Sequence, residues 1–157
     1  MAMREIVVGV ISDTHGLMRP AALAALRGSD LIIHAGDVGR LEVIDALRRL
    51  APIFAVRGNV DTADWATSLP TTATVTVGEL SFLVIHDIAE LDRDPAAAGF
   101  AAVIYGHSHR PAIETRDSVL FLNPGSAGPR RFTLPVALAR VRVAGRELRP
   151  EIAELRV

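Results

Sequence analysis

The chain has 157 residues and a formal net charge of −1, with half of its residues hydrophobic and 22% charged. This length predicts a single domain spanning residues 1–157, and the composition is typical of a soluble globular protein. The near-zero net charge gives no electrostatic reason to expect nucleic acid or an anionic membrane as a partner.

Cysteine and lysine are both absent from the chain. Disulfides and lysine nucleophiles are therefore excluded, and any metal site must use nitrogen and oxygen ligands. No apolar run reaches the ~20 residues of a membrane span. Residues 1–9 lack the three-part pattern of a signal peptide, so we expect a cytoplasmic protein.

The first sixty residues alternate between predicted strands and helices. Apolar runs predict buried strands at 5–11, 30–34 and 52–56. Pro20 suits the first position of a helix continuing over 21–27, and a stripe of Leu41, Ile44, Leu47 and Leu50 predicts a second helix over 41–50. This order implies a parallel sheet with right-handed crossovers.

The second half of the chain is rich in predicted hairpins. They pair 73–77 with 80–86, 112–116 with 119–122, and 136–143 with 147–155. A short helix is expected over 94–100 and a buried strand over 101–105. The predicted fold class is α/β, with two mixed β-sheets packed face to face and helices outside.

Side chains that can bind metals follow five of the predicted strands. They are Asp13, His15, Asp37, Asn59, His86, His107 and His109. Ligands in open α/β sheets gather beyond the carboxyl ends of strands, so we expect these side chains to share one rim. Their nitrogen and oxygen atoms suit two ions of Mn²⁺, Fe, Co²⁺, Ni²⁺ or Zn²⁺ better than Ca²⁺.

Two pairs of candidate ligands are spaced two residues apart. Alternate residues of an extended segment point the same way. We therefore expect Asp13 with His15, and His107 with His109, to act as two-toothed clamps.

Each of these segments also has a simpler interpretation when taken alone. Asp13 fits a helix cap, Asp37 and Asn59 fit turns, and His86 fits a core histidine. However, four of the five histidines follow predicted strands. Chance placement explains this coincidence poorly, which favours a metal site.

The ordered set Asp13-x-His15, Gly36-Asp37, Gly58-Asn59, His86 and Gly106-His107-x-His109 resembles the calcineurin-like metallophosphoesterase superfamily. The short length and Asn123-Pro124-Gly125-Ser126 look like its small YfcE-type phosphodiesterase branch. The motifs span roughly residues 6 to 130. The resemblance implies an αββα sandwich that hydrolyses phosphate esters.

The resemblance also implies a role for each candidate ligand. Asp13, His15 and His109 would hold one divalent ion, and Asn59, His86 and His107 a second, with Asp37 bridging both. Asp37, Asn59 and His107 are the expected catalytic residues, and Asn59 would also bind substrate. The ions, with Mn²⁺ the first choice over Ni, Fe, Zn, Co and Mg, would activate a bridging hydroxide for in-line attack on a small phosphate ester, preferably a diester.

The sequence departs from the wider family at two positions. Val60 follows Asn59 where many members carry a histidine, so the acid that protonates the leaving group is unassigned. Asp87 follows His86 where glycine is usual, and it could repel an anionic substrate, tighten metal binding or face solvent. Asp61 could orient a ligand or could serve only as a turn carboxylate.

Several other polar residues lie near the candidate ligands in sequence. Arg57 and Arg110 are candidate phosphate contacts, with surface ion pairing as the alternative. His34 is expected to be a core or supporting residue. The Asn123–Ser126 segment is expected to line the site wall.

Two other functional classes compete with a phosphoesterase that acts on small molecules. The retromer subunit Vps29 shares the family fold and works mainly through protein contacts, so a non-catalytic scaffold is the alternative. A nuclease is disfavoured, because one Trp and one Tyr offer no stacking platform for nucleic acid. A homo-oligomer is plausible, and no membrane partner is expected.

Overall fold

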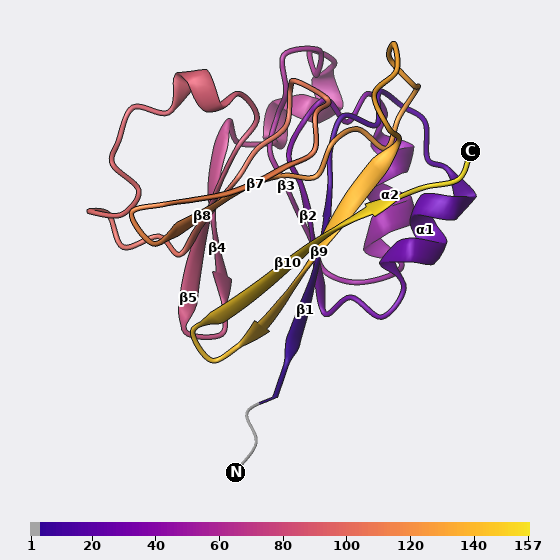
Figure 1. Ribbon diagram of the computed structural model, residues 1–157. Helices are drawn as coiled ribbons and strands as arrows, with labels where there is room; N and C mark the ends of the chain where they lie inside the picture. Colours follow the sequence, from indigo (N-terminus) through magenta and orange to yellow (C-terminus); the bar gives the residue numbers. More distant parts are fainter. Residues whose placement is uncertain (1–3) are drawn as a thin grey trace.

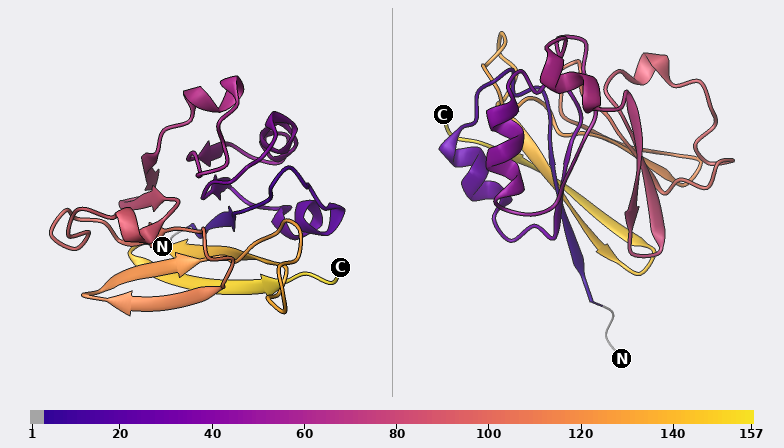
Figure 2. Two further views of the ribbon diagram at one scale, coloured as in Figure 1. Left: turned by 90° about the horizontal axis from the view of Figure 1, so that it is seen from above. Right: turned by 180° about the vertical axis from the view of Figure 1, so that it is seen from behind.

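The computed structural model describes residues 4–157, and within this range it has ten strands in two five-stranded sheets. Residues 1–3, which belong to the segment predicted not to be a signal peptide, lie outside the described residues. The two sheets face each other, with the two α-helices on one flank (Figure 1, Figure 2). The predicted fold class is confirmed.

The first sheet has the strand order β10-β9-β1-β2-β3. Its strands are β1 (Ile6–Ile11), β2 (Leu31–His34), β3 (Ile53–Ala55), β9 (Ala137–Ala144) and β10 (Glu147–Glu154). Strands β1, β2 and β3 are parallel, whereas β9 is antiparallel to both β1 and β10. The predicted parallel front half and C-terminal hairpin therefore combine in one sheet.

The second sheet has the order β4-β5-β6-β8-β7. Its strands are β4 (Thr72–Val77), β5 (Leu80–Ile85), β6 (Ala102–Ile104), β7 (Ala112–Arg116) and β8 (Val119–Asn123). Strands β5, β6 and β8 are parallel, and β4 and β7 pair antiparallel with β5 and β8 at the two edges.

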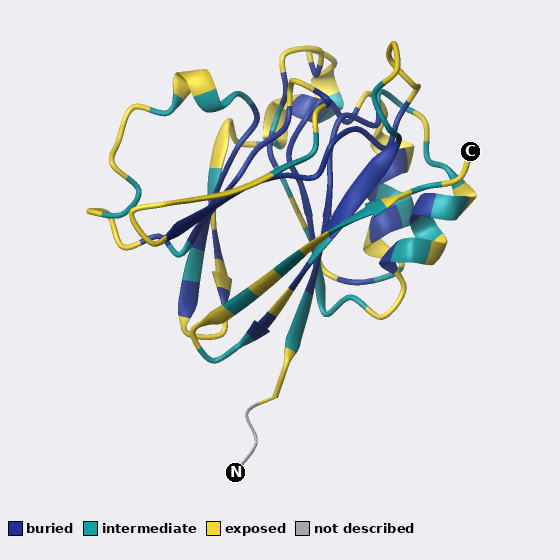
Figure 3. Ribbon diagram, viewed as in Figure 1, coloured by how far each residue is buried: buried dark blue, intermediate teal, exposed yellow. Residues whose placement is uncertain are grey.

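The main core lies between the two sheets. Alternate residues of each strand point into it, including Val8 and Val10 of β1 and Phe82 and Val84 of β5. All four are at most 1% exposed, and the inner strands are buried along most of their length (Figure 3). Burial of a side chain of this size contributes roughly 1.5–3 kcal/mol.

Helices α1 (Pro20–Leu26) and α2 (Leu41–Arg48) cover the outer face of the first sheet. Pro20 begins α1 at the position where its missing N–H costs nothing. The predicted apolar stripe of α2 was wrong at Leu41, which is 42% exposed, whereas Val43 is 1% exposed. Leu41 is the first residue of the helix, where its side chain does not reach the core.

The outer face of the second sheet is covered by a mostly irregular segment. Ile88, Leu91 and Phe100 of this segment pack against the sheet. The helix predicted over 94–100 was wrong: the chain forms the short 3₁₀ helix η2 (Ile88–Glu90) and then a turn. Gly99, at φ 84°, ends the turn before a helix can propagate. A second 3₁₀ helix, η1 (Asp64–Ser68), joins β3 to β4.

None of the helices in residues 4–157 has the length and apolar character needed to cross a membrane.

Candidate metal centre

The candidate ligands lie in loops that follow β1, β2, β3, β5 and β6. The first three strands are parallel in one sheet, and β5 and β6 are parallel in the other. Their carboxyl ends reach the same edge of the sandwich, at the top of Figure 1. The structure brings all seven predicted side chains together at this edge.

Most of these residues have a left-handed backbone. Asp13, His15, Asp37, His107 and His109 have φ angles of 55°, 47°, 56°, 74° and 63°. The extended conformation predicted for the two spaced pairs was therefore wrong. Asp13 and His15 nevertheless lie in one ligand group, as the predicted clamp requires, whereas His107 and His109 do not. Such φ values cost energy in residues with a Cβ atom, and they concentrate at functional sites.

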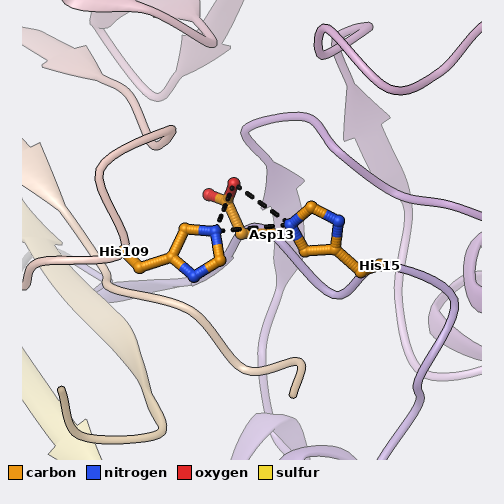
Figure 4. Close-up of side chains that lie close together, drawn as sticks. All are labelled: Asp13, His15 and His109. Carbon is orange, nitrogen blue, oxygen red and sulfur yellow. Dashed lines mark hydrogen bonds and ion pairs between the residues drawn. The ribbon is translucent and has the colours of Figure 1, made fainter. Parts of the chain in front are cut away.

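The first group consists of Asp13, His15 and His109, whose ligand atoms lie within 4.8 Å of one another. Asp13 Oδ1 is 3.3 Å from His109 Nε2 and 3.8 Å from His15 Nε2. The two Nε2 atoms are 3.3 Å apart. Figure 4 shows both rings turned toward the carboxylate, an arrangement that a shared cation would stabilise.

The second group consists of Asp37, His86 and His107, again with ligand atoms within 4.8 Å. Asn59 lies between its histidines: Oδ1 is 3.0 Å from His86 Nε2 and 3.2 Å from His107 Nδ1. Asp37 Oδ2 is 3.2 Å from His86 Nε2. Because His107 belongs here and His109 belongs to the first group, the histidine pair divides between the two groups.

The two groups adjoin each other. His15 Nε2 of the first lies 3.8 Å from Asp37 Oδ2 of the second, and His86 Nε2 of the second lies 3.9 Å from Asp13 Oδ1 of the first. Each of these two carboxylates therefore lies close to a histidine of each group.

The carboxylate of Asp13 provides a test of whether a cation fits. Its Oδ2 accepts hydrogen bonds from Ser12 Oγ at 2.6 Å and from His107 N at 3.0 Å. Its Oδ1 is buried and has no hydrogen-bond partner in the described part of the chain. A buried carboxylate oxygen without a partner costs free energy, and a divalent ion would satisfy it. The site therefore fits a metal.

Ionisation of the carboxylates supports the same conclusion. Burial raises the pKa of Asp13, but the nearby His109 ring, the hydrogen bond from Ser12 and the charge of His86 together outweigh it and lower that pKa below its usual value. Burial also raises the pKa of Asp37, but the hydrogen bonds with His86 and Val60 N and the charges of His86 and His15 together outweigh it and lower that pKa. Both side chains are thus anionic at neutral pH, as metal ligands must be.

The ring of His86 is fixed by its other nitrogen. Nδ1 donates to the carbonyl of Ala35 at 2.7 Å, which directs Nε2 toward Asp37 and Asn59. Burial lowers the pKa of His86, but its hydrogen bond with Asp37 and the charge of Asp13 outweigh this and raise it to about 9. Without a metal the ring is therefore protonated at neutral pH, and a metal would take the place of that proton.

A cavity of about 170 Å³ opens beside the second group. Its lining includes the candidate ligands Asn59, His86 and His107. A larger cavity of about 400 Å³ lies near the amino ends of β5, β6 and β8 and contains none of the candidate ligands. The smaller cavity is therefore the relevant one for chemistry, despite its size.

Charged side chains surround the smaller cavity. Arg57, Asp87 and Glu90 contribute to its wall. Asp87 Oδ2 lies 3.8 Å from His107 Nε2, so this carboxylate faces the site. Arg110 is exposed and is not part of this wall, unlike the other predicted phosphate contact.

Sequence reasoning missed several residues around the centre. Ser12 and Thr14 are fully buried and hydrogen-bond within the ligand loops. Glu90 and Thr71 line the cavity. The signal for Ser12 and Thr14 was their position in the sequence, because both are polar residues directly beside the candidate ligand Asp13. The cavity residues carried no signal, because they come from separate segments.

Asn123 and Ser126 bind the backbone of the ligand loops, but neither lines the cavity, so a place in the site wall stays a prediction. Ser126 Oγ donates to the carbonyl of Asp13 at 2.8 Å. Asn123 Nδ2 donates to the carbonyl of Gly106 at 3.1 Å.

Comparison with known proteins adds a family match. Residues 6–146 match the model of the calcineurin-like phosphoesterase superfamily domain. A probable metallophosphoesterase of Methanothermobacter thermautotrophicus is 31% identical over 158 residues, covering 93% of this chain and 91% of the relative.

Solved structures with the same fold come from two functional classes. An archaeal phosphodiesterase has a TM-score of 0.77 and 26% identity, covering 94% of this chain and all of that one. Vps29 from Chaetomium thermophilum also has a TM-score of 0.77, with 20% identity and coverage of 95% and 96%. At that identity, the likeness to Vps29 concerns the fold alone.

Proposed function

This chain belongs to the calcineurin-like phosphoesterase superfamily, and on that premise we propose that it is a hydrolase that cleaves a phosphodiester with two divalent metal ions. The observation that carries the proposal is the adjacency of the two ligand groups. Asp13 and Asp37 each face a histidine of the opposite group at 3.8–3.9 Å.

The proposed ligands divide between the two ions. Asp13, His15 and His109 would hold one, Asn59, His86 and His107 the other, and Asp37 would bridge them. Ions held by these residues would supply a hydroxide nucleophile and would neutralise charge on the phosphoryl oxygens. Nitrogen and oxygen donors favour Mn²⁺, with Ni, Fe, Zn, Co and Mg as alternatives.

The residues of the chain would orient the substrate. Asn59 is exposed and lies beside the cavity, so its side chain is available to the phosphate. Arg57 lines the same cavity and would contact a phosphoryl oxygen. Val60 is 45% exposed and has no proton to donate, so protonation of the leaving group would fall to water.

The carboxylates of the cavity favour a diester over a monoester. Asp87 and Glu90 place negative charge on the wall that would receive the alcohol portion of the substrate. A monoester dianion would meet more repulsion there than a diester monoanion. The cavity volume of about 170 Å³ also suits a small alcohol group.

The test is hydrolysis of a chromogenic phosphodiester by metal-stripped protein, before and after addition of Mn²⁺, Ni²⁺, Zn²⁺ or Mg²⁺. Activity is expected to return with metal. Mutation of a residue that only supports a metal ligand typically lowers activity roughly 10- to 100-fold. Because His107 is itself a proposed ligand, the activity of the His107→Ala variant is expected to fall by more than that. The side chain of His107 is 47% exposed, so the variant should fold.

Arg116→Ala is a matched control, since this exposed side chain pairs with Glu114 on an edge strand away from the centre. Full activity after thorough chelation, or in His107→Ala, would refute the two-ion proposal. Absence of activity with every metal in a folded protein would favour the alternative, a Vps29-like scaffold. The structural likeness to Vps29 is the reason to keep that alternative.

Other proposals concern the setting of the protein. We propose that residues 1–157 act as one unit, because both sheets contribute to each ligand group. A cytoplasmic location and a homo-oligomer stay predictions from the sequence.

A further inference from the structure

Asp61 lies two residues after the candidate ligand Asn59, and it is only 3% exposed. Its carboxylate accepts three backbone hydrogen bonds: Oδ2 from Val38 N at 3.1 Å and Gly58 N at 2.9 Å, and Oδ1 from Gly39 N at 2.9 Å. The side chain thus joins the loop that carries Asp37 to the loop that carries Asn59.

The connection between these loops is reciprocal. Asp37 Oδ1 accepts a hydrogen bond from Val60 N at 3.0 Å, so each carboxylate binds the backbone of the other loop. Gly58 packs directly against Asp37, and a Cβ atom at this position would collide with Asp37 N and Oδ1. We refer to these four hydrogen bonds as the Asp37–Asp61 network.

The backbone around Asp37 explains why such a network is needed. Gly36, Asp37 and Gly39 have φ angles of 101°, 56° and 90°, so this loop leaves the regular sheet. The amides of Val38 and Gly39 would have no acceptor there without Asp61. Val38 is buried whereas Gly39 is exposed. The cost of roughly 1–3 kcal/mol for an unpaired buried amide therefore applies to Val38, and the loop would relax to avoid that cost.

We propose that Asp61 is a positioning residue that sets the separation of Asp37 and Asn59, and with it the geometry of the second metal group. This inference rests on the proposed metal centre. The first group is held differently: Ser12 Oγ and His107 N fix the carboxylate of Asp13, and Ser126 fixes its carbonyl. Loss of Asp61 should therefore affect the two groups unequally.

The experiment is calorimetric titration of metal-stripped protein with Mn²⁺, without substrate, for the wild type and Asp61→Asn. Asparagine keeps the size of the side chain, but its NH₂ group replaces one carboxylate oxygen. One or two of the three backbone amides would then face a donor and lose their acceptor. The wild type is expected to bind two ions. Asp61→Asn is expected to bind the second ion roughly 10- to 100-fold more weakly, with the first little changed.

Electron paramagnetic resonance supplies an independent readout. Two neighbouring Mn²⁺ ions give a coupled spectrum in the wild type, and the variant should give the spectrum of an isolated ion. Asp30→Asn is the matched control, because the carboxylate of Asp30 also accepts a backbone hydrogen bond, from Val7 N at 2.8 Å. Asp30 lies at the amino end of β2, away from the centre. This control should bind both ions as the wild type does.

Equal weakening of both ions in Asp61→Asn, or wild-type binding of both, would overturn the proposal. Hydrogen exchange of the wild type covers the case in which Asp61→Asn does not fold. The amides of Val38, Gly39 and Gly58 should be protected from exchange. If these amides exchange as fast as those of exposed loops, the proposal is also overturned.

Failure of the proposed function is distinguishable from failure of this inference. A wild type that binds two ions but hydrolyses no ester refutes the activity and leaves Asp61 in its positioning role. If the wild type binds only one ion, the positioning role of Asp61 in a second metal group is refuted. If that protein still hydrolyses a phosphate ester, the proposed phosphoesterase activity stands.

Discussion

His34 illustrates how a single buried residue connects two ligand loops. Its Nδ1 accepts a hydrogen bond from Gly36 N at 3.1 Å, so its Nε2 carries the proton and donates to Thr14 Oγ1 at 3.0 Å. Thr14 in turn donates to the carbonyl of Val38 at 2.8 Å. The chain of bonds requires a neutral ring. The expectation that His34 is a core or supporting residue agrees with this placement.

Acid is expected to destabilise the metal-free protein through His34. Burial lowers the pKa of this ring from 6.5 to about 4 although Asp13 and Asp61 act to raise it. Because the folded pKa is below the unfolded one, the stabilisation is complete above pH 6.5 and is lost as pH falls toward 4, amounting to roughly 3 kcal/mol. Urea unfolding at pH 7 and pH 4.5 measures this loss.

The His34→Gln variant separates this residue from the carboxylates that also titrate in acid. Glutamine can still donate to Thr14 but does not titrate. The variant should therefore lose less stability than the wild type between the two pH values. An equal loss in both proteins would contradict the role assigned to His34.

At the scale of elements, strand ends and the loops after them form the centre. Apolar runs predicted where most strands lie, because buried strands need continuous hydrophobic residues. The loops were less predictable: the extended conformation expected for Asp13 and His15 is replaced by left-handed φ values. Contacts such as Asp13 N to Gly36 O at 3.0 Å hold that backbone, and sequence spacing does not reveal them.

The end of β8 is expected to stabilise the loop that carries His107. Asn123 is fully buried; it donates to the carbonyl of Gly106, and its Oδ1 accepts from Gly125 N at 2.9 Å. Asn123→Ala leaves Gly125 N without its acceptor, whereas the Gly106 carbonyl still accepts from Ser108 N at 2.9 Å. The variant should therefore lower the free energy of unfolding by roughly 1–3 kcal/mol. Denaturant titration of the metal-free protein tests this, with exposed Thr115→Ala on β7 as control. A change within 0.5 kcal/mol, about the effect of an ordinary surface substitution, would contradict it.

At the scale of the whole molecule, the centre joins the two sheets. The loops after β1, β2 and β3 belong to one sheet and supply Asp13, His15, Asp37 and Asn59. The loops after β5 and β6 belong to the other and supply the remaining three histidines. Each ligand group therefore includes residues from both sheets, and bound ions would hold the sandwich closed at this edge.

Metal binding is consequently expected to raise the melting temperature. An ion at about 100 times its dissociation constant adds ~2.7 kcal/mol, which for a chain of this size corresponds to roughly 5–10 °C. Thermal unfolding with Mn²⁺ and then with excess chelator measures the change. His109→Ala, which removes a ligand of the first group, should show a smaller shift. The same melting temperature with and without metal would count against metal binding by the folded protein.

The sequence by itself determined the α/β class, the strands and the identity of the candidate ligands, because these depend on local patterns of apolar residues and the polar residues that follow them. The family resemblance implied how the ligands group, and only the tertiary structure shows which contacts bring them together. His15 meets His109 across 94 residues of chain, while the adjacent His107 turns to Asn59. It also decided that Asp61 binds the Asp37 loop and that Glu90 lines the cavity. These relations arise where loops of two sheets meet, and residue spacing along one segment does not encode such contacts.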